Sequence, residues 1–218
     1  MKVLAILSEK GGAGKTTVTV HLAVAAQLAG LDVAVIDLDP QASAADWSDR
    51  RGKDPEAVAI PPARLDKLLS DLRANGADLA IIDTGRDSNN AGYTAAQAAD
   101  LILIPCRGSG FDFRALSRTL DLCRLSHKRP RLLLNGMRPG ASRAAADARE
   151  ALSGHDCDIA PIIIHDRAAY RAASITGRTA QEAEPGSAAA VEISQLYSWI
   201  DGQLELSTTG QTDMKATA

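Results

Sequence analysis

The chain has 218 residues, of which 45% are apolar and 23% are charged, and its formal net charge is −3. This composition is sufficient for a packed core and excludes intrinsic disorder as the main state. No apolar run approaches the roughly 20 residues of a membrane-spanning helix, and the first residues lack the cleavage site of a secretion signal. Three cysteines without C-x-x-C spacing argue against a disulfide framework and a cysteine zinc site. We therefore expect a cytoplasmic globular protein.

Short apolar runs alternate with helical patterns along the whole chain, which is typical of βαβ units in a doubly wound α/β fold with a mostly parallel sheet. The runs are nearly continuous, as expected for strands covered by helices on both faces. In chain order the predicted strands are Val3–Leu7, Val33–Ile36, Leu79–Ile82, Leu101–Pro105, Leu132–Leu134 and Ala160–Ile164. The predicted helices are Lys15–Ala29, Ser43–Arg51, Ala63–Asn75, Ala91–Ala99, Phe113–His127, Arg143–Ser153 and Ala188–Leu206.

The sequence shows no internal repeat and no clear domain boundary. We therefore expect residues 1–206 to form one domain and residues 207–218, which contain Ser, Thr and Gly, to be a disordered tail. Residues 52–62 contain three prolines and are expected to form an irregular connector.

A glycine-rich segment follows the first predicted strand and opens the first predicted helix. It reads KGGAGKTT, a variant of the phosphate-binding pattern G-x-x-x-x-G-K-[ST] in which Glu9 stands at the first glycine position. Backbone N–H groups of such a loop surround phosphate oxygens, and the positive end of the helix faces them. Lys15 is expected to contact the β- and γ-phosphates and the Thr16 hydroxyl to ligate Mg²⁺. The nucleotide-binding residues that this pattern predicts are Gly11, Gly12, Ala13, Gly14, Lys15, Thr16 and Thr17.

Two predicted strands lead into acidic residues. The second continues as Asp37-Leu-Asp39-Pro-Gln and the third as Asp83-Thr. The C-terminal ends of parallel strands face the ligand crevice of a doubly wound sheet, so these carboxylates are candidates to approach the phosphates. Asp83 is placed to hold Mg²⁺, an ion that keeps much of its hydration. Asp37 and Asp39 share a strand face if the strand extends that far; the alternative is that they only cap the next helix.

The segment KGGAGKTT resembles the deviant Walker A motif of ParA/MinD-type ATPases, and the chain looks closest to short partition ParA proteins that lack an N-terminal helix-turn-helix. The resemblance includes the second acidic motif, D-x-D-P-Q, and covers residues 2–206 approximately. It implies ATP and Mg²⁺ as cofactors and a doubly wound fold. It also implies that Lys10 reaches the nucleotide of a partner protomer, that Asp39 orients the attacking water, and that Asp37 lies near Mg²⁺. The predicted catalytic groups are thus Lys10, Lys15 and Asp39.

Two further segments bear on this resemblance. Asn135 follows a predicted strand and resembles the asparagine that often reads the adenine edge in the family, a task that suits its amide; an ordinary turn asparagine is the alternative. After Asp83 and Thr84 the family commonly continues with prolines, whereas this chain continues with Gly85 and Arg86. Gly85 is a candidate hinge, and Arg86 is a candidate contact to phosphate or to a partner.

Charge is unevenly distributed, because residues 107–149 hold ten basic and three acidic side chains. Such a band favours salt-sensitive, sequence-independent contacts with DNA phosphates, with ordinary solvated arginines as the alternative. The resemblance implies an ATP-dependent homodimer that binds nonspecific DNA and thereby associates with the nucleoid. It also implies that a ParB-like centromere-binding protein stimulates slow hydrolysis and releases the dimer, so that plasmid or chromosomal DNA is segregated. The candidate DNA contacts are Arg138, Arg143, Arg167, Arg171 and Arg178.

Two other functions compete with this prediction. The same ATPase chemistry would serve to position a protein cargo or to assist conjugative DNA transfer. A metabolic P-loop enzyme, such as an amidoligase or a small-molecule kinase, is disfavoured by Lys10 and by the lack of an inserted substrate domain. The residues after Leu206 contain one basic residue and little apolar bulk, so we expect no MinD-like membrane anchor.

Overall fold

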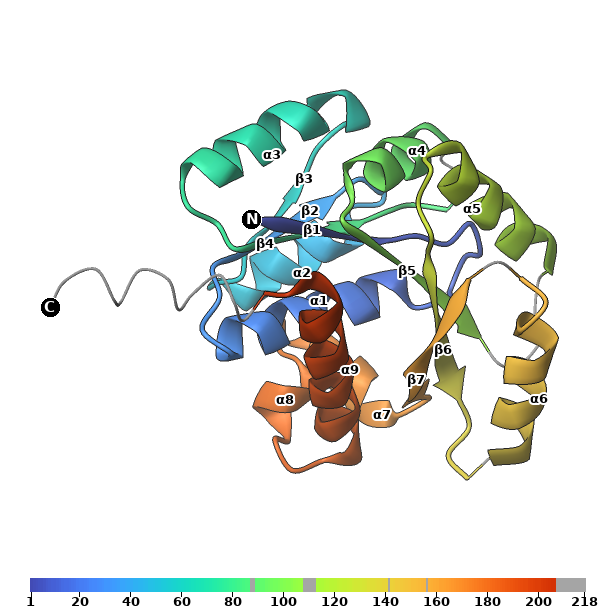
Figure 1. Ribbon diagram of the computed structural model, residues 1–218. Helices are drawn as coiled ribbons and strands as arrows, with labels where there is room; N and C mark the ends of the chain where they lie inside the picture. Colours follow the sequence, from blue (N-terminus) through green and yellow to red (C-terminus); the bar gives the residue numbers. More distant parts are fainter. Residues whose placement is uncertain (87–88, 108–112, 141, 156, 207–218) are drawn as a thin grey trace, which may run out of the picture.

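The computed structural model describes residues 1–86, 89–107, 113–140, 142–155 and 157–206. Within these residues seven parallel strands form one sheet, in the order β3-β2-β4-β1-β5-β6-β7 (Figure 1). The predicted doubly wound α/β fold is therefore confirmed. The strands are β1 (Lys2–Ile6), β2 (Val33–Asp37), β3 (Ala57–Ala59), β4 (Leu79–Asp83), β5 (Leu101–Arg107), β6 (Arg131–Met137) and β7 (Asp158–His165).

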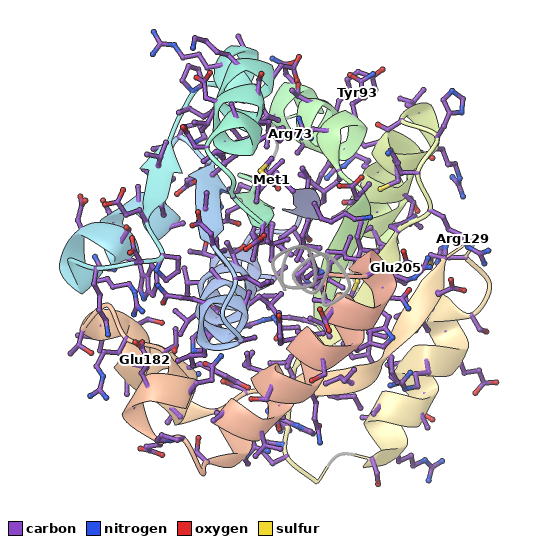
Figure 2. All side chains as sticks on the ribbon, turned by 60° about the vertical axis from the view of Figure 1, so that its left-hand side comes forward. Met1, Arg73, Tyr93, Arg129, Glu182 and Glu205 are labelled. Atoms are coloured by element: carbon purple, nitrogen blue, oxygen red, sulfur yellow. The ribbon has the colours of Figure 1, made fainter. Side chains whose placement is uncertain are left out.

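Helices cover both faces of this sheet, and side chains fill the space between the layers (Figures 1 and 2). One face carries α1 (Lys15–Leu28), α2 (Ser43–Arg51), α7 (Ala168–Ile175), α8 (Ala180–Ala183) and α9 (Ala188–Leu204). The other carries the short 3₁₀ helix Pro62–Arg64, α3 (Leu65–Ala74), α4 (Asn89–Ala98), α5 (Phe113–Leu125) and α6 (Ser142–Leu152). No helix in the described part of the chain is both long enough and apolar enough to cross a bilayer.

The central strand β1 shows why its apolar run is continuous. Leu4 and Ile6 belong to the apolar cluster with α1 and α9, whereas Val3 and Ala5 belong to the cluster with α4 and α5. Successive side chains of a strand point to opposite faces, so a strand buried on both faces needs an apolar residue at every position.

Three local predictions were wrong. The connector over residues 52–62 contains the edge strand β3, which pairs with the end of β2. Only three residues long and followed by two prolines, it gives no apolar run of its own. Helices α7 and α8 were not predicted, and Asn135 lies within β6 rather than after it. The predicted tail, residues 207–218, lies outside the described residues.

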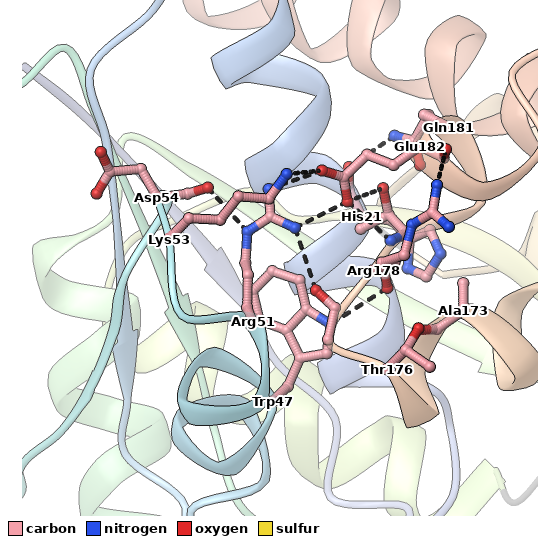
Figure 3. A network of polar contacts seen from close by, with 12 residues as sticks. His21, Trp47, Arg51, Lys53, Asp54, Ala173, Thr176, Arg178, Gln181 and Glu182 are labelled. Carbon is pink, nitrogen blue, oxygen red and sulfur yellow. Dashed lines mark hydrogen bonds and ion pairs between the residues drawn. The ribbon is translucent and has the colours of Figure 1, made fainter.

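A buried polar cluster joins the end of α2 to the segment around α8 (Figure 3). The Arg51 side chain is 1% exposed and donates hydrogen bonds to both Glu182 carboxylate oxygens, at 2.8 and 3.0 Å, and to the Gly177 carbonyl oxygen, at 3.1 Å. Burial opposes ionisation of Glu182, but the hydrogen bonds from Arg51 and Lys53 outweigh it and lower the pKa of Glu182 to about 2. Arg51 and Glu182 therefore both stay charged inside the protein, because hydrogen bonds within the protein replace those to water.

His21 connects α1 to the same cluster. Its Nδ1 lies 2.8 Å from the Thr17 carbonyl oxygen, and its Nε2 lies 3.1 Å from the Ala180 backbone N–H. Because a carbonyl can only accept and an N–H can only donate, these contacts fit the neutral ring protonated on Nδ1. Burial lowers the pKa of His21 to about 4.

Acid therefore opposes folding through His21. Its pKa is lower in the folded chain than the ordinary 6.5, so the stability it contributes is present above pH 6.5 and is lost as the pH falls toward 4, by about 3 kcal/mol in full. Urea unfolding of the wild type is expected to show about 2 kcal/mol of this loss between pH 7 and pH 5. His21→Gln should be less stable at pH 7 but lose less on acidification, whereas exposed His127→Asn should follow the wild type. Parallel pH slopes in all three proteins would contradict this assignment.

Candidate functional site

The C-terminal ends of three adjacent strands meet in the middle of the sheet. The parallel register places Asp83 of β4 beside Ile6 of β1 on one side and beside Asp37 of β2 on the other. The loops that follow these strands surround a cleft of about 580 Å³, lined by Gly11–Thr17, Asp39–Gln41, Ser43 and Arg86. The structure thus brings the glycine-rich loop, the second acidic motif and the segment after Asp83 into one site.

A hydrogen bond connects the two ends of the glycine-rich loop. Lys15, the first residue of α1, is 8% exposed, and its Nζ donates a hydrogen bond of 2.8 Å to the Ser8 carbonyl oxygen. Gly12 and Gly14 adopt φ values of +70° and +89°, a backbone conformation that favours glycine. The chain can therefore turn tightly between β1 and α1 and leave its N–H groups at the cleft.

Asn135 supports this loop from inside β6. It is buried, and its Nδ2 donates a hydrogen bond of 2.6 Å to the Ala13 carbonyl oxygen. A Cβ atom on Gly14 would lie 2.3 Å from the same nitrogen, so Asn135 occupies the space that the glycine leaves. No pattern in the sequence indicates this positioning role, since the contact joins residues 122 positions apart. The predicted contact with adenine stays a prediction.

Thr16 of the glycine-rich loop is hydrogen-bonded to the buried Asp83 at the end of β4. The Thr16 hydroxyl donates to Asp83 Oδ2 at 2.6 Å, and the carboxylate itself is 0% exposed. Its other oxygen, Oδ1, has no hydrogen-bond partner in the described part of the chain. Burial raises the pKa of Asp83 to about 7, with a further contribution from the neighbouring Asp37. A hydroxyl and a carboxylate oxygen lacking a partner are the kinds of ligand that Mg²⁺ prefers.

Asp37 and Asp39 do not lie along one strand face, because β2 ends at Asp37. Asp37 Oδ1 accepts the N–H of Asp39 at 2.9 Å, and Oδ2 accepts the N–H groups of Ala44 and Ala45 at 2.8 and 3.3 Å. Burial raises the pKa of this carboxyl. Asp37 therefore holds the Asp39 loop and the first turn of α2 in place, as in the helix-capping alternative. Asp39 itself lines the cleft.

Lys10 lies beside the cleft rather than in its wall. It lines a small pocket with Pro105, Cys106 and Arg107 at the end of β5, and its backbone N–H donates to the Ser8 hydroxyl at 3.3 Å. The two lysines of the motif thus occupy different places: Lys15 lines the cleft, whereas Lys10 lines the neighbouring pocket at the end of β5.

The candidate DNA-binding arginines fall into two groups. Three have partners within the protein: Arg167 pairs with Glu192, Arg171 pairs with Asp166, and Arg178 donates to the Glu182 carbonyl oxygen. The other two are Arg138, just after β6, and Arg143, at the start of α6; both are exposed, as are Arg171 and Arg178.

Comparison with known families shows which protein family the chain belongs to. Residues 4–179 match the family model described as the CobQ/CobB/MinD/ParA nucleotide binding domain, and this match includes every strand of the sheet except the first two residues of β1. The chain belongs to this family. The chain is therefore a nucleotide-binding domain of this family, and the contact of its glycine-rich loop with phosphate stays a prediction.

Relatives of this domain include proteins with several different names. "Maintenance of carboxysome distribution protein A" from Gloeobacter kilaueensis is 34% identical over 84% of this chain and 89% of its own length. "Protein ParA" from Rhizobium radiobacter is 30% identical over 56% of each chain. The septum site-determining protein MinD of Pyrococcus horikoshii, solved with Mg-ADP, has a TM-score of 0.70 and 19% identity over 92% of this chain and 96% of its own. This last likeness shows the shared fold.

The contact between Gly14 and Asn135 gives a matched test of the phosphate-binding loop. Gly14→Ala is expected to abolish nucleotide binding, because its Cβ atom would collide with Asn135. Gly12→Ala is the control, since it also forces alanine to a positive φ, at a cost of about 1–2 kcal/mol, but its Cβ atom meets nothing within 4 Å. Equilibrium dialysis with labelled ADP measures both variants. Equal losses in the two would show that backbone strain, not the Asn135 contact, governs the loop.

Proposed function

We propose that this domain is a slow ATPase that uses Mg²⁺·ATP, dimerises on ATP, binds nonspecific DNA, and leaves it after partner-stimulated hydrolysis, thereby segregating plasmid or chromosomal DNA. The observation that carries the proposal is the arrangement of one cleft. The glycine-rich loop and Asp39 line it together, while Lys10 lies outside this lining, in the neighbouring pocket at the end of β5. A lysine in that position suits the nucleotide of a facing protomer, as the ParA/MinD resemblance implies.

The described residues fit the cofactors that the proposal needs. Lys15 and the N–H groups of the loop would hold the phosphates, and the Thr16 hydroxyl and Asp83 Oδ1 would hold Mg²⁺ directly or through water. When bound, Mg²⁺ neutralises charge on the phosphates. Asp37 would act by holding the Asp39 loop, and Asp39 by orienting the attacking water. The Mg-ADP in the MinD neighbour is consistent with this assignment.

Arg138 and Arg143 are the arginines that best support the DNA-binding part of the proposal. Both are exposed and belong to the basic residues 107–149, whereas Arg167, Arg171 and Arg178 would have to exchange partners within the protein for phosphate. A ParB-like protein is the proposed partner, and the ParA relative supports partition.

A second candidate keeps the ATPase cycle and changes the cargo to a protein assembly. The relative named for carboxysome distribution favours it, since that similarity extends over 84% of this chain. Stimulation of ATP hydrolysis by a centromere-binding protein would decide for partition, and stimulation by a component of a protein assembly would decide for positioning.

Substitutions at Lys10 and Asp39 test the catalytic cycle. Lys10→Ala is expected to lose ATP-dependent dimerisation and hydrolysis while still binding nucleotide, because Lys15 remains in the cleft. Asp39→Ala is expected to dimerise on ATP and to remain dimeric, because the water is no longer oriented. Light scattering and phosphate release measure both steps, with exposed Lys67→Ala as the control. Wild-type turnover in Lys10→Ala, or failure of Asp39→Ala to dimerise, would contradict these roles.

The double variant Arg138→Gln/Arg143→Gln tests the DNA contacts. With ATP, its DNA affinity is expected to fall for all sequences alike, and the slope of log K against log salt to decrease by about 2, since each phosphate contact contributes about 0.9. Fluorescence anisotropy at several salt concentrations measures both quantities. The double variant Lys67→Gln/Arg73→Gln, which removes two exposed positive charges from α3, serves as the charge-matched control. An unchanged slope, or equal DNA binding without nucleotide, would count against the proposal.

A further inference from the structure

The segment after β4 places a second cation in the wall of the cleft. We propose that Arg86 binds the terminal phosphate of ATP within its own protomer and thereby makes the domain distinguish ATP from ADP. This inference rests on the proposed ATPase function and adds a residue that the motifs of the glycine-rich loop do not include.

The first observation is the contact between Arg86 and the start of the phosphate-binding loop. A Cβ atom on Gly11 would lie 3.3 Å from both Cδ and a guanidinium nitrogen of Arg86. The arginine side chain therefore rests on the Gly11 backbone, and both residues line the same cleft. A side chain at position 11 would push the guanidinium away from the loop.

The second observation is the contact between Gly85, the residue before Arg86, and Asp39. A Cβ atom on Gly85 would lie 3.0 Å from Asp39 Oδ1 and 3.1 Å from its Cγ, so the backbone at residue 85 packs directly against the Asp39 carboxylate. The segment formed by Gly85 and Arg86 therefore reaches from the Asp39 carboxylate to the Gly11 backbone. If Asp39 orients the water that attacks the terminal phosphate, a cation on this segment faces that phosphate rather than the α- or β-phosphate.

The chemistry of the side chain suits this position. A guanidinium remains charged at every physiological pH and presents paired donors that match two oxygens of one phosphoryl group. The terminal phosphoryl group is absent from ADP, so a contact limited to it strengthens the binding of ATP alone. In the transition state, negative charge spreads over the oxygens of the transferred group, and the same guanidinium would then also favour hydrolysis.

The test compares two ligands and three variants: Arg86→Gln removes the charge, Arg86→Lys keeps it without the paired donors, and Arg73→Gln removes a charge elsewhere. Arg73 is exposed at the end of α3, on the side of the sheet where Met1 and the strand beginnings lie (Figure 2). Isothermal titration with Mg²⁺ and ATPγS, and separately with Mg²⁺ and ADP, gives both dissociation constants. The variants are measured in the Lys10→Ala background, so that dimerisation does not contribute.

For Arg86→Gln we expect a roughly tenfold to hundredfold weaker ATPγS complex, as for loss of a charged hydrogen bond, with ADP affinity within twofold of the parent. Arg86→Lys should fall between, and Arg73→Gln should match the parent. Equal losses of affinity for both nucleotides, or no loss for either, would overturn the proposal. If affinity is unchanged but Arg86→Gln impairs dimerisation of the otherwise wild-type chain, Arg86 contacts the partner protomer instead. A parent protein that binds neither nucleotide would refute the ATPase function itself.

Discussion

The register of β1, β4 and β2 is the constraint on which the rest of the site depends. Asp83 has Ile6 on one side and Asp37 on the other, so three loops leave the sheet at the same level. A shift of one residue in β4 would turn Asp83 to the opposite face of the sheet and separate it from Thr16. It would also move Gly85 away from Asp39. Apolar residues buried on both faces hold this register, because any slip would leave them without their packing partners.

The cleft combines two kinds of charge at different depths. The carboxylates of Asp37 and Asp83 are buried behind the lining residues Asp39 and Thr16, to which they are hydrogen-bonded, and burial raises the pKa of each. Arg86 lies in the exposed wall. A triphosphate with its divalent cation matches this distribution, since the metal can approach the buried carboxylates while the phosphate oxygens face cations and backbone N–H groups. The hydrogen bonds that Asp37 accepts from backbone N–H groups keep the Asp39 loop arranged without a ligand.

The sequence predicts those parts of the fold whose signal is local. The strands of the sheet centre, such as β1 and β4, are apolar at nearly every position, and the glycine-rich loop carries its own pattern. Edge strand β3 escapes prediction because it consists of Ala57, Val58 and Ala59, only one of which is bulky. Helix α8 escapes because it has only four residues.

The contacts of the site are less predictable than its residues, because they join distant parts of the chain. Pattern alone selected Thr16, Asp39 and Asp83, and the structure brings them to one cleft. The bond from Asn135 to Ala13 and the packing of Arg86 on Gly11 depend instead on the order of the strands and on the exact path of each loop. No periodicity or spacing in the sequence encodes these approaches, so the sequence does not predict which side chains pack against the loop.

Helix α2 links the cleft to a distant part of the surface. Its first turn is bonded to Asp37 beside the Asp39 loop, and its last residue, Arg51, is bonded to Glu182 and Gly177 near α8. A Cβ atom on Gly177 would lie 2.4 Å from the Arg51 backbone nitrogen, so these two segments have no room to slide past each other. If the Asp39 loop moves and tilts α2, either the Arg51 hydrogen bonds break or α7 and α8 move together with α2. Helix α2 therefore couples a movement at the cleft to the position of α7 and α8.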